Sequence, residues 1–125
     1  MGNRILVVDD EADQVELLAF NLRRRGYAIA TALNGVEALS QVRQLAPDLI
    51  LLDWMMPELD GLEVCQILRR DSVTAALPII MLTAVASDFG RLTGLASGAS
   101  AYMTKPCNLV QLVARIDELL APPRQ

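Results

Sequence analysis

Three short runs of continuously hydrophobic residues stand out along the chain, at residues 5–8, 49–52 and 79–82. Each run has the length of a strand, and none alternates between apolar and polar positions. This pattern predicts strands that are buried on both faces, as in a parallel sheet covered by helices. Two mixed segments, Tyr27–Thr31 and Ala101–Thr104, are weaker strand candidates whose composition suits the edges of a sheet.

Segments with helical periodicity fill the intervals between these strands. The first is expected to stop at Gly26, because glycine commonly terminates helices. The second is predicted to begin at Asn34, with Glu37 three residues later as in a capping box, and to end at Pro47. The other three helices are expected after Asp60, over residues 87–97 and over residues 109–120.

The order of elements is therefore strand then helix, repeated five times. Such alternation predicts an α/β fold, in which helices cover both faces of a parallel sheet. Right-handed crossovers and central apolar strands then favour a doubly wound five-stranded sheet of order 2-1-3-4-5, the order of flavodoxin-like folds. We expect one domain over residues 1–121, and interpret Pro122–Gln125 as a C-terminal tail or the start of a linker.

Composition excludes several classes of function. The 125 residues are 53% hydrophobic and carry a formal net charge of −4, which argues against direct nucleic-acid binding by this domain. No apolar run approaches the length of a membrane span, and the N-terminal residues do not resemble a signal peptide. Cys65 and Cys107 form no metal or redox motif, so a cytoplasmic location is expected.

Chemically useful side chains follow the strands. Asp9 and Asp10 come directly after the first strand, Asp53 follows the third, Thr83 ends the fourth and Lys105 follows the fifth. Ligands of such sheets bind at the carboxyl ends of the strands, so these residues are expected to converge. Taken singly, each has an ordinary structural explanation, such as helix capping for the first two aspartates. The functional hypothesis depends on their convergence.

Three clustered carboxylates repel one another, and a hard divalent cation relieves that repulsion. Ligation by oxygen alone suits Mg²⁺, or Mn²⁺ in its place. A carboxylate such as Asp53 can attack phosphorus to give an acyl phosphate. Lys105 could hold one phosphoryl oxygen and Thr83 could donate a hydrogen bond to another.

Four stretches of the sequence also carry a family resemblance: ILVVDDE (5–11), LILLDWMMPELDG (49–61), PIIMLTA (78–84) and GASAYMTKP (98–106). In this order and at these separations they are highly specific, and the chain resembles a bacterial response-regulator receiver domain over about residues 3–121. The resemblance implies that Asp53 is the phosphoacceptor. It further implies that Asp10, Asp53 and the backbone carbonyl of Met55 ligate Mg²⁺, with Asp9 acting through water.

The same resemblance assigns Thr83 and Tyr102 to a switch pair, Lys105 to phosphate binding, and a cis peptide to Lys105–Pro106. The expected donor is a sensor histidine kinase or a phosphotransfer protein. The expected output surface comprises the fourth helix, the fifth strand and the fifth helix, and a phosphorylation-dependent dimer is compatible with it. The kinase and the downstream output domain or target are not identified by the sequence.

Two other functions are compatible with this fold class but fit the sequence less well. A phosphatase with an aspartate nucleophile commonly has a second aspartate two residues later, where this chain has Met55. A flavin-binding protein would need a phosphate-binding loop after the first strand, where residues 9–13 read Asp-Asp-Glu-Ala-Asp. Because the side chains of Met55 and Val85 flank the expected site and cannot hydrogen-bond a water, we also expect slow self-dephosphorylation. Beyond self-catalysed phosphoryl acceptance and this slow loss, we expect no enzyme activity.

Overall fold

Residues 3–121, which a computed structural model describes, fold around a five-stranded sheet. The strands are β1 (Arg4–Val8), β2 (Ala28–Ala32), β3 (Leu49–Leu52), β4 (Ile79–Thr83) and β5 (Ala101–Thr104). Their order is β2-β1-β3-β4-β5, and all neighbouring strands are parallel. The predicted fold class and strand order are confirmed. The predicted tail, Pro122–Gln125, lies outside the described residues.

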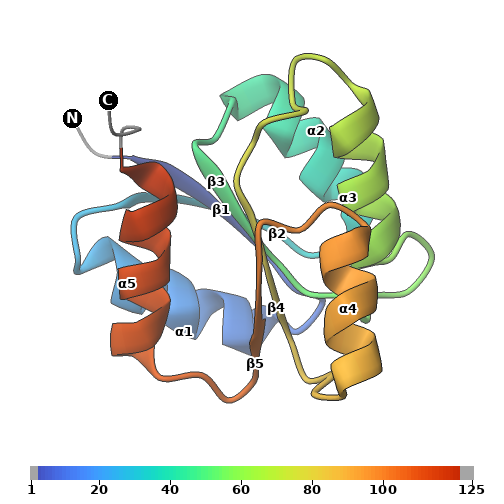
Figure 1. The fold of residues 1–125 in the computed structure, drawn as a ribbon. Coiled ribbons are helices and arrows are strands. Elements are labelled where there is room, and N and C mark those ends of the chain that lie inside the picture. Colours follow the sequence, from blue (N-terminus) through green and yellow to red (C-terminus); the bar gives the residue numbers. More distant parts are fainter. Residues whose placement is uncertain (1–2, 122–125) are drawn as a thin grey trace.

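Five helices connect and cover the strands (Figure 1). They are α1 (Ala12–Arg23), α2 (Gly35–Leu45), α3 (Gly61–Arg70), α4 (Asp88–Ala96) and α5 (Leu109–Leu120). Helices α1 and α5 pack on one face of the sheet, and α2, α3 and α4 pack on the other. Within the described residues, no helix has both the length and the apolar character needed to cross a membrane.

The central strands are buried on both faces, which explains their continuous hydrophobicity. Leu6 and Ile50 face the core beneath α2, α3 and α4, while Val7 and Leu51 face the core beneath α1 and α5. All four side chains are at most 2% exposed. Burying one such side chain typically stabilises a fold by about 1.5–3 kcal/mol. The strands are therefore held firmly in the core, and the residues at their carboxyl ends have well-defined positions.

The second strand begins one residue later than predicted. Tyr27 belongs to the turn after α1, where its N–H donates to the carbonyl of Leu22 (3.4 Å), and its hydroxyl donates to Asp117 on α5. Pairing with β1 therefore begins at Ala28, opposite Arg4, and ends at Ala32. The hydrophobic pattern did not reveal this shift, because the turn is set by contacts with two helices.

Helix caps also differ in detail from the prediction. Asn34 caps α2 and accepts from the N–H of Glu37 (2.7 Å), but the Glu37 carboxylate accepts from the N–H of Leu33 instead of that of Asn34. The reciprocal half of the expected capping box is therefore wrong. A complete capping box is present at α3, where Asp60 and Glu63 each accept the other's backbone N–H (3.0 and 3.1 Å).

Candidate functional site

Backbone hydrogen bonds between neighbouring strands continue one residue beyond the ends of the strands, into the site. The N–H of Asp9 donates to a carbonyl of β2 (3.2 Å), and that of Asp53 donates to the last carbonyl of β1 (3.0 Å). The N–H of Lys105 donates to the carbonyl of Thr83 (2.8 Å), and the Lys105–Pro106 peptide bond is cis. These side chains thus project from anchored backbone at the carboxyl edge of the sheet.

The predicted residues line one cleft of about 780 Å³ at this edge. The cleft brings together Asp9, Asp10, Asp53, Met55, Thr83 and Lys105. Tyr102 does not join them, but lines a neighbouring cleft of about 410 Å³ between α4, β5 and the beginning of α5.

Three carboxylates form the acidic part of the site. Asp9, Asp10 and Asp53 each offer an oxygen, and these oxygens lie within 4.8 Å of one another. Asp9 and Asp53 are only 5% and 7% exposed, whereas Asp10 is exposed to solvent. The Oδ1 atom of Asp53 is buried and has no hydrogen-bond partner within residues 3–121. A buried oxygen normally has a partner, and this set of carboxylate oxygens fits a hard divalent cation.

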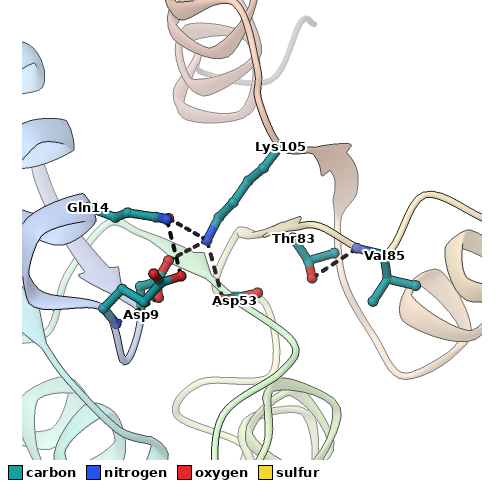
Figure 2. Close-up of polar contacts among 7 residues, drawn as sticks. Asp9, Gln14, Asp53, Thr83, Val85 and Lys105 are labelled. Carbon is teal, nitrogen blue, oxygen red and sulfur yellow. Dashed lines mark hydrogen bonds and ion pairs between the residues drawn. The ribbon is translucent and has the colours of Figure 1, made fainter.

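Lys105 supplies the positive charge of the site, as Figure 2 shows. Its Nζ donates to Asp9 Oδ2, to Gln14 Oε1 (3.0 Å) and to Asp53 Oδ2 (3.3 Å). Partial burial acts to lower the pKa of Lys105, but the hydrogen bond to Asp9 and the charge of Asp53 outweigh it and raise that pKa. Lys105 is therefore a firmly charged ammonium that spans two of the three aspartates.

The first turn of α1 contributes two contacts that the sequence analysis did not identify. The backbone N–H of Glu11 donates to Asp9 Oδ1 (3.0 Å), and Gln14 Nε2 donates to the Glu11 carboxylate (3.1 Å). Gln14 thus accepts from Lys105 while its amide is oriented by Glu11. A signal was present, because Gln14 lies in the first turn of α1, only a few residues after Asp9 and Asp10, and so near the carboxyl end of β1.

Thr83 and Tyr102 both form hydrogen bonds with the main chain of Val85. Thr83 is fully buried, and its Oγ1 accepts from the N–H of Val85 (3.4 Å). The Tyr102 hydroxyl donates to the carbonyl of Val85 (2.6 Å), and burial together with the charge of Asp53 raises the pKa of that hydroxyl. The sequence could not reveal this meeting point, since Val85 takes part through its main chain.

The fold and the acidic site together define a flavodoxin-like α/β domain with a candidate cation site, and sequence comparison gives its family. The response regulator receiver domain matches residues 5–117, so the chain belongs to that family. Receiver domains of this kind act in two-component response regulators, which are signalling proteins, and they bind Mg²⁺ at an acidic pocket.

Curated relatives support the same family. The chain is 48% identical over 120 residues to the alkaline phosphatase synthesis transcriptional regulatory protein PhoP of Bacillus subtilis, covering 96% of this chain and 49% of the relative. It is 43% identical over 117 residues to the DNA-binding dual master transcriptional regulator RpaA of Synechocystis, covering 94% and 48% respectively. The chain thus spans about half the length of the curated relatives it matches.

Solved structures resemble the whole described domain. A putative response regulator from Chloroflexus aurantiacus superposes with a TM-score of 0.93 at 35% identity, covering 98% of this chain and 100% of that one. The chemotaxis protein CheY4 of Vibrio cholerae gives a TM-score of 0.90 at 31% identity, covering 96% and 100%. These similarities agree with the strand order and helix arrangement described above.

Proposed function

We propose that Asp53 is the residue that accepts the phosphoryl group in this receiver domain. The observation that carries this proposal is the buried, unpartnered Oδ1 atom of Asp53, whose other carboxylate oxygen faces Lys105. One oxygen therefore keeps its lone pairs free of protein donors, while the other lies beside a cation. Asp9 lacks such an oxygen, because its two oxygens accept from Glu11 and Lys105.

The proposed direct ligands of Mg²⁺ or Mn²⁺ are Asp10, Asp53 and the backbone carbonyl of Met55. Asp9 is proposed to act through a water. Bound there, the cation would supply charge neutralisation for the carboxylates and for the incoming phosphoryl oxygens. The closeness of the three carboxylates and the exposure of Asp10 to the cleft support this set.

In the proposed reaction, a carboxylate oxygen of Asp53 forms a bond to phosphorus as the bond between phosphorus and the donor's leaving atom breaks. The donor is the phosphohistidine of a sensor histidine kinase or a phosphotransfer protein, and its imidazole retains the bonding electrons. Lys105 would move its ammonium onto one phosphoryl oxygen, and the Thr83 hydroxyl would donate to another. The product is an acyl phosphate that the domain forms by self-catalysed acceptance and loses slowly, without enzymatic turnover.

Phosphorylation is proposed to act on the surface formed by α4, β5 and α5. Thr83 would exchange its contact with the Val85 N–H for the phosphoryl group, and Tyr102 would favour its buried position. The ring already occupies that position in this structure, with an exposed fraction of 9%. Phosphorylation would therefore bias an existing equilibrium between two positions of the ring, as expected for a ligand that prefers one state.

The names of the relatives suggest how the signal is used. PhoP and RpaA are called transcriptional regulators, and RpaA is called DNA-binding. We infer that this domain works in the cytoplasm and controls an output domain or a separate target. A dimer formed after phosphorylation fits such a role. The net charge of −4 leaves any DNA contact to the output partner.

Intact-mass spectrometry tests the proposal. Wild-type protein treated with acetyl phosphate or phosphoramidate and Mg²⁺ is expected to gain the mass of one phosphoryl group, and Asp53→Asn is expected to gain none. Asp13→Asn is a matched control, because Asp13 is an exposed carboxylate in the first turn of α1. No gain in wild type, or an equal gain in Asp53→Asn, would overturn the proposal.

A further inference from the structure

The inner face of α4 is built from two glycines one helical turn apart. Gly90 and Gly94 are both buried, although each weakens a helix of only nine residues. A Cβ atom on Gly94 would lie 2.6 Å from Cδ1 and 2.7 Å from Cε1 of Tyr102. Contacts below 3.0 Å are essentially never made by real Cβ atoms, so the buried ring position requires a glycine there.

Gly90 packs just as closely against Val85 and also lies near Trp54, in the segment that carries Asp53. A Cβ atom on Gly90 would lie 2.5 Å from Cγ1 of Val85 and 3.3 Å from Cζ3 of Trp54. Trp54 directly follows Asp53, and its carbonyl accepts from the N–H groups of Met56 and Gly61 (3.1 and 2.9 Å). The indole thus extends from an anchored backbone to the first turn of α4.

The opposite end of α4 is tied to α3 by Arg69. Its Nε donates to the carbonyl of Gly98 (2.8 Å), two residues after the helix, and its NH1 donates to the carbonyl of Leu77 (2.7 Å). Its NH2 donates to Ser100 Oγ (3.3 Å), which also accepts from the N–H of Ile79 on β4 (3.0 Å). The C-terminal half of α4 is therefore held by several hydrogen bonds just beyond its end and places Gly94 against Tyr102, whereas the N-terminal half places Gly90 against Val85 and Trp54.

We propose that Gly94 is the positioning residue that admits the Tyr102 ring to its buried position, and that Gly90 couples α4 to Trp54. One face of α4 thus meets Tyr102 at Gly94 and the segment that carries Asp53 at Gly90. When Tyr102 leaves, the space beside Gly94 opens and the buried face of α4 loses one of its two close contacts. This inference deepens the proposed function and rests on it for its link to phosphorylation.

The variant Gly94→Ala tests the proposal by NMR of protein with labelled tyrosine. Tyr27, the other tyrosine, contacts α5 and serves as an internal reference. In Gly94→Ala, the Tyr102 ring is expected to become several-fold more accessible to a soluble paramagnetic agent, while Tyr27 stays unchanged. Leu92→Ala, on the exposed side of the same helix, is the matched control. Equal accessibility of Tyr102 in wild type and Gly94→Ala would overturn the proposal.

A double-mutant cycle keeps the proposal testable if Gly94→Ala is too unstable for NMR. Replacing Tyr102 with the smaller Leu removes the ring that an alanine at position 94 would meet. Gly94→Ala is therefore expected to shift the midpoint of urea unfolding strongly in wild type and much less in Tyr102→Leu. Equal shifts in both backgrounds would contradict the contact between Gly94 and Tyr102.

The tests of Gly94 and Gly90 give results that are independent of the test of phosphorylation on Asp53. Gly94→Ala leaves every residue of the acidic cleft intact, so it should still gain one phosphoryl group from acetyl phosphate. Absence of that gain in wild type would refute phosphorylation without bearing on the ring position. In Gly90→Ala, the fluorescence of Trp54, the single tryptophan, should change, whereas an unchanged spectrum would contradict the coupling to Trp54.

Discussion

Asp53 differs from the neighbouring aspartates in how its two oxygens are used. The Oδ2 atom lies 3.3 Å from the Lys105 ammonium, whereas Oδ1 is buried without a partner in the described chain. Leaving a buried acceptor unpaired typically costs about 1–3 kcal/mol, and a cation bound at Oδ1 would recover part of that cost. At the scale of a single residue, Oδ1 of Asp53 is therefore the oxygen that we expect to respond most strongly to a bound cation.

The lifetime of the phosphoryl group is predicted to depend on Met55. This side chain is 57% exposed in the cleft, and a thioether is a poor acceptor for a water that would attack phosphorus. Met55→Asn should shorten the lifetime about 2–10-fold, since one hydrogen bond contributes about 0.5–1.5 kcal/mol and 1.4 kcal/mol is a factor of ten. Loss of phosphoryl mass with time after donor removal measures this. Met55→Leu should behave as wild type, and equal lifetimes in all three proteins would contradict the role of Met55.

The first residue of helix α3 packs against the segment that carries Asp53 and Trp54. A complete capping box fixes its start, and Gly61 packs so closely that an added Cβ would collide with the carbonyl of Asp53 and lie 2.8 Å from Cα of Trp54. A cap of this kind typically contributes about 1 kcal/mol. The element thus fixes both the position of Asp53 and the direction of Trp54.

Gly61→Ala is predicted to disturb both stability and phosphorylation. Overpacking against backbone atoms should lower the free energy of unfolding by about 1–3 kcal/mol, as measured by urea denaturation. Displacement of the Asp53 backbone should also slow phosphoryl gain from acetyl phosphate. Gln66→Ala, at an exposed position of α3, should stay within about 0.5 kcal/mol of wild type. If Gly61→Ala behaved like this control in both measurements, the close packing of Gly61 against Asp53 and Trp54 would not be needed for stability or for phosphorylation.

Elements built on buried strands were predictable because burial on both faces leaves a clear hydrophobic pattern. The bounds of β3 and β5 agree with the prediction, whereas β2 shifted by one residue because Tyr27 is held by the turn after α1. The convergence of Asp9, Asp53 and Lys105 also followed from strand order. The contacts of Gln14 and Val85 did not, since they depend on side-chain direction and on main-chain atoms.

At the scale of the whole molecule, the two hydrophobic cores support an edge that carries three acidic side chains. Asp9, Asp10 and Asp53 repel one another, and Lys105 offsets only part of this repulsion through its contacts with Asp9 and Asp53. The stability of the fold should therefore respond to whatever binds at that edge.

Stability is accordingly predicted to depend on Mg²⁺. A ligand that binds only the folded state at 100 times its dissociation constant adds about 2.7 kcal/mol, so Mg²⁺ should raise the midpoint of thermal unfolding of wild type. Asp10→Asn should be more stable than wild type in EDTA, because one repelling charge is removed, and should gain less from Mg²⁺. Asp13→Asn should respond to Mg²⁺ as wild type does. An unchanged response in Asp10→Asn would remove Asp10 from the proposed ligand set.

The central claim is that the phosphoryl group resides on Asp53. Borohydride reduces an acyl phosphate to the alcohol, so phosphorylated aspartate becomes homoserine and can be located by peptide mass spectrometry. After treatment with acetyl phosphate and Mg²⁺, followed by borohydride, we predict homoserine at position 53 and unmodified aspartate at positions 9 and 10. Homoserine at position 9 or 10, or phosphoryl mass with no homoserine at position 53, would contradict the account.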